Sequence, residues 1–461
     1  MIRRVLIAGL DAATPELVFH RFRDDLPNLK RLMGQGTYAP MKSCHPPITI
    51  PAWAVMATGK SPGQLGLYGF RHRKGSSYKD GWIANSQTIH EPALWNILGR
   101  QGRPVCLVGV PPSYPPFPVN GNLLSCFITP DLAHPHTYPP ELAPEIASVV
   151  GEYLFDVEFR TGDRDALLAG VYEMTEKRFK VLHHLLTTKP WDLAMFVEIG
   201  VDRIQHAFWK YFDPGHPKYV PGNKYENAVR DYYRYLDKQL GGLLAILDQE
   251  TAVVVVSDHG AKGMRGAFCV NQWLMDKGYL QLKNKPDSVI SIEQANLDWP
   301  HTRAWGWGGY YARIFFNVKG REPQGIIEPG DLEAAKDELI LRLKDIRDPA
   351  GRVMATQVYR PEELYPESRG DKPDLMVYFD ELFWRSAGTI GHGTWYLDEN
   401  DTGPDDAVHA QHGIFILYEP GKVRGRSLSE VDILDIAPTV LRLLGIAQPK
   451  DMVGHPVVLE A

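Results

Sequence analysis

The stretch Thr251–Gly260, TAVVVVSDHG, decides the fold prediction. Its continuous apolar run is typical of a short strand buried on both faces, as in a parallel sheet. Asp258 and His259 follow at the carboxyl end of this run, which is where open α/β sheets bind their ligands. Asp258 and His259 are adjacent, so their side chains point in different directions, and packing alone does not readily explain both at a strand end. The stretch therefore predicts a parallel sheet with a functional site at its edge.

Working outward from this strand, similar β-branched runs recur along the chain and alternate with helical patterns. The helical patterns cover Arg164–Leu186, Asn223–Gln249 and Asp432–Ile446. Alternation of this kind predicts an α/β fold with a doubly wound, mostly parallel sheet. The further predicted strands are Arg3–Asp11, Pro104–Val110, Asp192–Ile199, Asp374–Asp380 and Gly413–Glu419.

Two regions interrupt the alternation. Pro111–Pro144 is rich in Pro and Asn, which predicts a long loop over one face of the sheet. Residues 269–372 contain a polar stretch and a further helical pattern, which we interpret as an inserted lid subdomain. The catalytic core is then expected over residues 1–268 and 373–461.

Composition narrows the function classes. The chain has 461 residues with 44% hydrophobic side chains and a net charge of −6, and no basic tract favours binding to a nucleic-acid polymer. The sequence contains no run of about 18 apolar residues, so no membrane span is predicted. The apolar run Val5–Leu10 is too short for a secretory signal. The four cysteines form no CxxC pair, so we expect a reduced, cytoplasmic protein. The oligomeric state stays open.

Metal-ligating residue types gather at the predicted strand ends. Singly, each has an ordinary explanation: Asp11 also suits a helix N-cap, and an Asp and a His four residues apart share one helix face without needing a metal. Together, carboxylates and imidazoles suit a zinc-like divalent ion, and two such groups hold two ions about 4 Å apart. The candidates are Asp11, Asp202, His206, Asp258, His259 and His409.

Thr49 opens the segment TIPAW, Thr49–Trp53, at a predicted helix N-terminus. Free backbone N–H groups and the helix dipole favour a phosphate or oxyanion there. A cation lowers the pKa of a bound alcohol as it does that of water. We expect Thr49 both to cap the helix and to act as an alkoxide nucleophile.

Several segments, in this order along the chain, resemble the alkaline phosphatase superfamily, most closely its type I phosphodiesterase/nucleotide pyrophosphatase branch. They are GLDAATPELV, TIPAWAVMATGKSPGQLGLYGF, DRIQH, VVVVSDHGAKGM, HAQHGIFIL and DILDIAPTVLRLLGI. The resemblance implies two divalent ions, usually Zn²⁺, with Mn²⁺ as the alternative. It implies that one ion is held by Asp202, His206 and His409, and the other by Asp11, Asp258 and His259, with Thr49 close by.

The chain departs from the branch at one point and leaves two histidines to place. The nucleotide pyrophosphatases carry an Asn that helps to hold a phosphoryl oxygen where Ala52 stands here. His412 competes with His409 as a ligand, although the family spacing favours His409. His392, in TIGHGTWY, and Arg71 are candidate substrate contacts, with an ordinary loop histidine and an exposed arginine as the alternatives.

The implied activity is hydrolysis of a small-molecule phosphate ester through a phosphothreonine, with a phosphodiesterase or nucleotide pyrophosphatase expected first. A phosphomonoesterase or phosphonate hydrolase of the same fold is the alternative, and a non-catalytic binding protein is a second. A sulfatase is disfavoured because CHPPI has Ile48 where a sulfatase needs Arg. A cofactor-independent phosphoglycerate mutase is disfavoured because Thr stands in place of its Ser.

Overall fold

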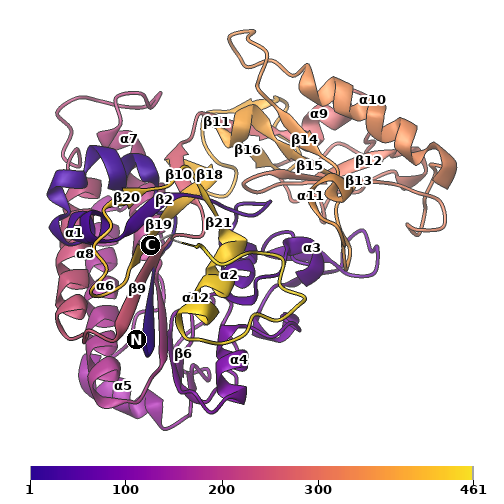
Figure 1. Ribbon diagram of the computed structural model, residues 1–461. Coiled ribbons are helices and arrows are strands. Elements are labelled where there is room, and N and C mark those ends of the chain that lie inside the picture. The colour runs from indigo at the N-terminus through magenta and orange to yellow at the C-terminus, as the bar shows by residue number, and fades with distance from the viewer. Residues whose placement is uncertain (1, 459–461) are drawn as a thin grey trace.

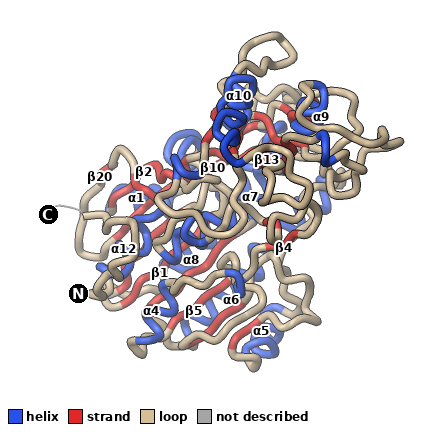
Figure 2. The backbone as a smooth tube through the Cα atoms, turned by 90° about the vertical axis from the view of Figure 1, so that its right-hand side faces the viewer, coloured by secondary structure: helices blue, strands red, loops and turns tan. Residues whose placement is uncertain are grey.

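A computed structural model describes residues 2–458, which form a large α/β core and a smaller region beyond one end of it (Figures 1 and 2). The core is built on a ten-stranded sheet with the order β20-β2-β19-β9-β1-β8-β5-β6-β7, in which β21 also pairs with β2. The strands are β1 (Arg4–Leu10), β2 (Thr37–Lys42), β5 (Val105–Val108), β6 (Gly121–Leu124), β7 (Thr137–Tyr138), β8 (Leu193–Glu198), β9 (Thr251–Val256), β19 (His412–Tyr418), β20 (Arg426–Ser427) and β21 (Val431–Asp432).

The predicted doubly wound, mostly parallel sheet is confirmed. Five neighbouring strands, β9, β1, β8, β5 and β6, run parallel to one another. Strand β1 shows why both faces are covered, because Leu6 and Ala8 enter one hydrophobic cluster while Val5 and Ile7 enter another. The first cluster includes side chains of α1 (Pro27–Gln35), α5 (Leu142–Val150), α6 (Arg164–Thr188), α7 (Gly200–Phe212) and α8 (Ala228–Ala245); the second includes those of α2 (Thr49–Thr58), α4 (Leu94–Arg100) and α12 (Ile436–Leu443).

Two expectations about the sheet were wrong in detail. The segment expected at Gly413–Glu419 forms β19 of the central sheet, but it runs antiparallel to β9 and β2. The chain leaves β9 through β10 (Gly260–Gly263) and returns through its antiparallel partner β18 (Ala407–Ala410), so it re-enters the sheet from the edge at which it left. The segment Pro111–Pro144, expected as a long loop, also contains β6 and β7. The sequence did not predict β6 because its apolar pair Leu123–Leu124 is short and lies in a proline-rich segment.

The smaller region has two sheets and a hydrophobic cluster of its own. One sheet has the order β12-β13-β15-β14, from β12 (Ala304–Trp307), β13 (Ala312–Phe316), β14 (Gln357–Tyr359) and β15 (Leu375–Tyr378). The other has the order β16-β11-β17, from β11 (Gly266–Cys269), β16 (Trp384–Ala387) and β17 (Tyr396–Leu397). Helices α9 (Val270–Asp276) and α10 (Leu332–Lys344) join the same cluster, and α11 (Pro361–Leu364) follows β14.

These sheets extend past the 269–372 segment on both sides, because β11 begins before it and β15 to β17 follow it. The run Asp374–Asp380, expected in the core sheet, lies here as β15. A short apolar run predicts a buried strand but not the sheet to which the strand belongs; Leu375 and Val377 are fully buried in the smaller region. A hairpin of β3 (Arg71–Arg73) and β4 (Gly81–Ile83) follows the short helix α3 (Pro62–Leu65). None of the helices described in residues 2–458 has the length and apolarity of a membrane span.

Candidate active site

Three adjacent strands bring the candidate ligands to one edge of the sheet. In the order β9-β1-β8, the register pairs Gly9 with Val256 and Leu10 with Glu198, so the carboxyl ends of the three strands coincide. Asp11 comes directly after β1, and Asp258 and His259 come two and three residues after β9. Helix α7 begins just beyond β8 and carries Asp202 and His206 one turn apart on its first turns.

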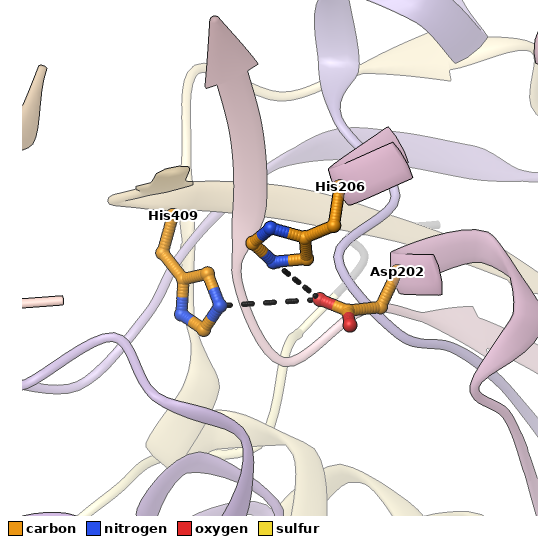
Figure 3. Close-up of side chains that lie close together, drawn as sticks. All are labelled: Asp202, His206 and His409. Atoms are coloured by element: carbon orange, nitrogen blue, oxygen red, sulfur yellow. Dashed lines mark ion pairs between the residues drawn. The ribbon is translucent and has the colours of Figure 1, made fainter. Parts of the chain in front are cut away.

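Asp202, His206 and His409 form the first group (Figure 3). His206 Nε2 lies 3.2 Å from Asp202 Oδ1, and His409 Nε2 lies 3.9 Å from the same oxygen. His409 reaches this point from β18, where it pairs with Ala261 of β10. All three side chains are buried, and their ligand atoms lie within 4.8 Å of one another.

Asp11, Asp258 and His259 form the second group, which is equally buried. His259 Nε2 lies 3.2 Å from Asp258 Oδ2 and 3.8 Å from Asp11 Oδ1. The two groups adjoin, because the rings of His259 and His409 stack with their centroids 3.7 Å apart. The hydroxyl of Thr49 faces the second group, with Oγ1 3.3 Å from His259 Nε2.

The unsatisfied atoms of the site fit two cations. Asp11 Oδ1, Asp202 Oδ1, Asp258 Oδ2 and His409 Nε2 are buried without a hydrogen-bond partner, which is rare for polar groups in a folded protein. The other polar atom of each of these four side chains has a hydrogen-bond partner. His409 Nδ1 donates to Pro47 O (2.8 Å) and His259 Nδ1 to Gly260 O (3.0 Å), an arrangement that directs the Nε2 lone pairs into the site. A set of three carboxylates and three imidazoles suits Zn²⁺ or a similar divalent ion.

The two groups differ in their electrostatics. Against the effect of burial, His206 lowers the pKa of Asp202 and Asp405 raises the pKa of His206, whereas burial dominates at the other ligands. Burial, and then the charge of Asp202, raise the pKa of Asp11 well above its ordinary value. Burial, and then the charge of Asp11, do the same to the pKa of Asp258. Burial lowers the pKa of His259 to about 4, and burial with the neighbouring imidazoles lowers the pKa of His409, so both rings are neutral and able to coordinate.

Several side chains that orient the ligands carried no signal in the sequence. Asp405 Oδ1 accepts from His206 Nδ1 at 2.7 Å and so aims His206 Nε2 at the group. Trp53 Nε1 donates to Asp11 Oδ2 at 2.7 Å. Tyr310, from the loop between β12 and β13, places its hydroxyl 3.3 Å from His206 Nε2 and stacks on His409 at 3.5 Å. None belongs to a spaced ligand pattern, although Trp53 lies within the TIPAW segment.

Thr49 does not cap helix α2, contrary to expectation. Ile48 is the N-cap residue and makes no side-chain cap bond, and Thr49 is already the first helical residue. A first-turn side chain projects outward from the helix end, so the Thr49 hydroxyl is free to face His259. The first backbone bond of the helix runs from Ala52 N to Ile48 O, which leaves the N–H groups of Thr49 and Ile50 ahead of it.

The remaining candidate residues fall in different places. His412 lies outside both groups and pairs with Glu430 at 2.7 Å on the surface. His392 also lies outside both groups and contacts Thr389 Oγ1 at 2.7 Å. Arg71 lines a cavity beside the first group. Ala52 is buried in the hydrophobic cluster under the sheet, so it supplies no polar atom to the site.

Comparison with known proteins agrees with this geometry. The family model described as type I phosphodiesterase / nucleotide pyrophosphatase matches residues 5–413, nearly the whole chain and both ligand groups. The chain belongs to this family.

Two further proteins are similar to this member of the phosphodiesterase family. The fold is similar to that of human ectonucleotide pyrophosphatase / phosphodiesterase 5, with a TM-score of 0.55 and 14% identity over 97% of this chain and 96% of that one. At this identity the likeness concerns the fold alone. A 2,3-bisphosphoglycerate-independent phosphoglycerate mutase of Akkermansia muciniphila is 31% identical over 70 residues, which are 15% of this chain and 14% of the mutase. The match thus spans about a seventh of that relative's length.

Proposed function

We propose that the protein hydrolyses phosphoric esters, with phosphodiesters or nucleotide pyrophosphates as the expected class, and that Thr49 is the nucleophile. The observation that carries the proposal is the position of the Thr49 hydroxyl. It lies at the start of α2, 3.3 Å from His259 Nε2, beside two groups of buried ligand atoms of which four lack a hydrogen-bond partner. Family membership supports a hydrolase of phosphoric esters.

We propose two divalent cations as cofactors, Zn²⁺ first and Mn²⁺ as the alternative. Asp202, His206 and His409 would hold one, and the other three ligands, Asp11, Asp258 and His259, would hold the second. When bound, such cations lower the pKa of an alcohol or water and neutralise charge that develops on oxygen.

In the first step, groups at the start of α2 supply the nucleophile and orient the phosphoryl group. A bond forms between Thr49 Oγ1 and phosphorus while the bond from phosphorus to the leaving oxygen breaks; the leaving group departs with the electron pair and the hydroxyl proton is lost to solvent. The N–H groups of Thr49 and Ile50 supply the phosphoryl cradle that the missing Asn at Ala52 does not. In the second step a water oxygen bonds to phosphorus while the bond from phosphorus to Thr49 Oγ1 breaks; a proton of the water restores the hydroxyl and the phosphate product leaves.

Four buried cysteines without disulfide bonds support the proposal of a reducing, cytoplasmic location.

The direct test replaces Thr49 with Ala and with Ser in metal-loaded protein. The assay follows p-nitrophenyl phosphate, bis-p-nitrophenyl phosphate, a phosphonate ester and a sulfate ester. Thr49→Ala should lower turnover of the best phosphate ester by roughly 10³-fold or more, since a nucleophile is removed, while Thr49→Ser keeps a hydroxyl and retains much of it. Thr58→Ala is the matched control, because Thr58 is a buried threonine at the far end of the same helix.

Metal content by mass spectrometry accompanies the assay, and Thr49→Ala should still take up both ions. Unchanged turnover by Thr49→Ala would remove Thr49 from the reaction. A sulfate ester as the best substrate would contradict the phosphoric ester class, and protein that takes up neither Zn²⁺ nor Mn²⁺ would favour a non-catalytic role.

A further inference from the structure

Tyr310 brings a hydroxyl from the smaller region to the first ligand group. Its Oη lies 3.3 Å from His206 Nε2, and its ring stacks on that of His409 with the centroids 3.5 Å apart. The half-buried side chain also lines a cavity of about 390 Å³, which Ile48, the residue before Thr49, lines as well. The hydroxyl therefore lies between the ligand group and the space that a substrate can enter.

A close contact between two backbones sets the position of Tyr310. The preceding residue, Gly309, exchanges two backbone hydrogen bonds with Ser386 of β16, at 2.8 and 3.0 Å. A Cβ added to Gly308 would lie 2.3 Å from Gly388 N, so only glycine lets the two segments approach this closely. The loop between β12 and β13 is therefore fastened to β16 just before Tyr310.

The side chains around Tyr310 hold its ring in place. The guanidinium of Arg385 lies over the ring at 4.3 Å, on the face that His409 leaves open. Asp405 accepts from Arg385 Nη1 at 3.1 Å and from His206 Nδ1 at 2.7 Å. One carboxylate thus orients both the group that covers the Tyr310 ring and the imidazole that faces its hydroxyl.

Three nearly parallel rings run across the two ligand groups. His259 stacks on His409 with the centroids 3.7 Å apart and 18° between the planes, and Tyr310 stacks on His409 with 24° between the planes. Two rings cannot share one face of His409 at these distances, so His259 and Tyr310 lie on its opposite faces. Thr49 contacts His259 at one end of this stack, and Tyr310 forms the other end. The two hydroxyls therefore approach the joined groups from opposite ends.

This arrangement suits an in-line displacement. The leaving oxygen lies on the far side of phosphorus from the nucleophile, and with Thr49 as nucleophile it points toward the first group, where Tyr310 lies. The partner of the Tyr310 hydroxyl, His206 Nε2, is an atom that the first proposed cation would take. The guanidinium of Arg385 has no acceptor atom. The phenolic proton is then available to an oxygen of the substrate.

We propose that Tyr310 is a catalytic residue whose hydroxyl donates a hydrogen bond to the leaving oxygen while the bond from phosphorus to that oxygen breaks. The proton stays on Tyr310, and the hydrogen bond stabilises the negative charge that the leaving oxygen gains with the electron pair. The inference rests on the proposed function and concerns the side of the reaction opposite Thr49. A donor aimed at charge that develops only in the transition state raises kcat rather than substrate affinity.

The test is Tyr310→Phe, which keeps the ring and its stacking and removes the hydroxyl alone. The substrates are methyl aryl phosphates with 4-nitrophenyl, phenyl or 4-methoxyphenyl as the aryl arm, or the aryl monophosphates where these turn over faster. The hydrogen bond strengthens as the leaving oxygen becomes more basic. The loss in kcat should therefore rise from roughly tenfold with the 4-nitrophenyl ester to roughly 10²- to 10³-fold with the 4-methoxyphenyl ester, with little change in KM.

Tyr279→Phe is the matched control, because Tyr279 also belongs to the smaller region and its hydroxyl donates to Glu338 Oε1 at 2.8 Å, away from the site. It should leave all rates unchanged. Two measurements on Tyr310→Phe need no turnover. Competition with a chelator should give wild-type dissociation constants for both ions. Isothermal titration of the metal-loaded protein with vanadate, which has an apical oxygen in the place of the leaving oxygen, should show binding weaker by roughly tenfold or more.

The outcomes separate a catalytic hydroxyl from a structural one. A loss in kcat that is equal for all leaving groups, or no loss, overturns the assignment to the leaving oxygen and leaves the hydrolase proposal standing. Weaker metal binding with wild-type kcat at saturating metal makes Tyr310 a positioning residue for His206 and overturns its catalytic role.

Other outcomes separate this inference from the proposed function. Weaker vanadate binding by Tyr310→Phe, in a protein that hydrolyses none of the esters, supports the oxyanion donor and overturns the hydrolase proposal. A loss that rises with leaving-group basicity in Tyr310→Phe, beside full turnover by Thr49→Ala, supports Tyr310 and removes Thr49 from the reaction.

Discussion

Replacing Asp405 with Asn tests whether a residue behind His206 supports the first proposed metal-ligand group. Asp405 Oδ1 accepts from His206 Nδ1 at 2.7 Å, and its other oxygen binds Arg160 and Arg385 at 3.2 and 3.1 Å. Asn keeps the shape of the side chain but removes the charge. His206 then loses the carboxylate that fixes its tautomer and strengthens its Nε2 as a ligand.

The expected loss follows from this single contact. Partners behind a ligating histidine are worth about 10- to 100-fold in metal affinity, or about 1.4 to 2.8 kcal/mol. Only one of the two ions should be affected, because Asp405 contacts His206 and none of Asp11, Asp258 or His259. Competition with a chromogenic chelator measures the two dissociation constants.

Asp380→Asn is the matched control, since Asp380 is also a buried carboxylate paired with arginines, but in the smaller region. It should leave both metal affinities within a factor of about two. Two unchanged dissociation constants in folded Asp405→Asn would refute the role given to this contact. Equal weakening at both sites would indicate a general loss of structure instead.

Further predictions concern the second ligand group and its surroundings. Trp53→Phe removes the donor to Asp11 and should weaken binding of the other ion by roughly tenfold, measured by the same competition. Gly9→Ala should lower the free energy of unfolding by about 1–3 kcal/mol in urea titration, because its Cβ would lie 2.5 Å from the Trp53 ring, whereas Gly34→Ala, with open space around it, should not. The raised pKa values of Asp11 and Asp258 mean that the folded metal-free protein binds more protons than the unfolded chain, so its stability falls as pH rises through them. Because Zn²⁺ displaces the protons that Asp11 and Asp258 hold, the increase in melting temperature on adding Zn²⁺ should grow as pH rises from the ordinary aspartate range through the raised pKa values; an increase independent of pH would contradict this.

Much of the core could be predicted because the relevant signals are local. The apolar runs at β1, β8 and β9 identify buried strands, and their parallel alignment brings the residues that follow them to one edge. The four-residue spacing of Asp202 and His206 fixes one face of α7. The direction of β19 and the sheet that takes up β15 depend on where the chain returns, which short apolar runs do not encode.

The residues that surround the site could be predicted less well from the sequence, for a related reason. Asp405 is distant from His206 in sequence, and Tyr310 arrives from the smaller region, so neither makes a spacing pattern with the ligands. The capping role expected of Thr49 failed by a single position: Ile48 takes the N-cap, and this shift turns the hydroxyl toward His259. Boundaries of helices are the least determined part of a sequence-based prediction, and here one residue separates a capping hydroxyl from a hydroxyl that faces His259.

The central claim is that Thr49 takes the phosphoryl group between two metal-ligand groups. The most direct measurement is acid-quenched peptide mapping by mass spectrometry of metal-loaded enzyme caught during turnover of bis-p-nitrophenyl phosphate. The predicted result is a nitrophenylphosphoryl group on the peptide that contains Thr49, absent from the same enzyme without substrate and from Thr49→Ala with substrate. Full turnover with no modified peptide, together with an active Thr49→Ala variant, would contradict it.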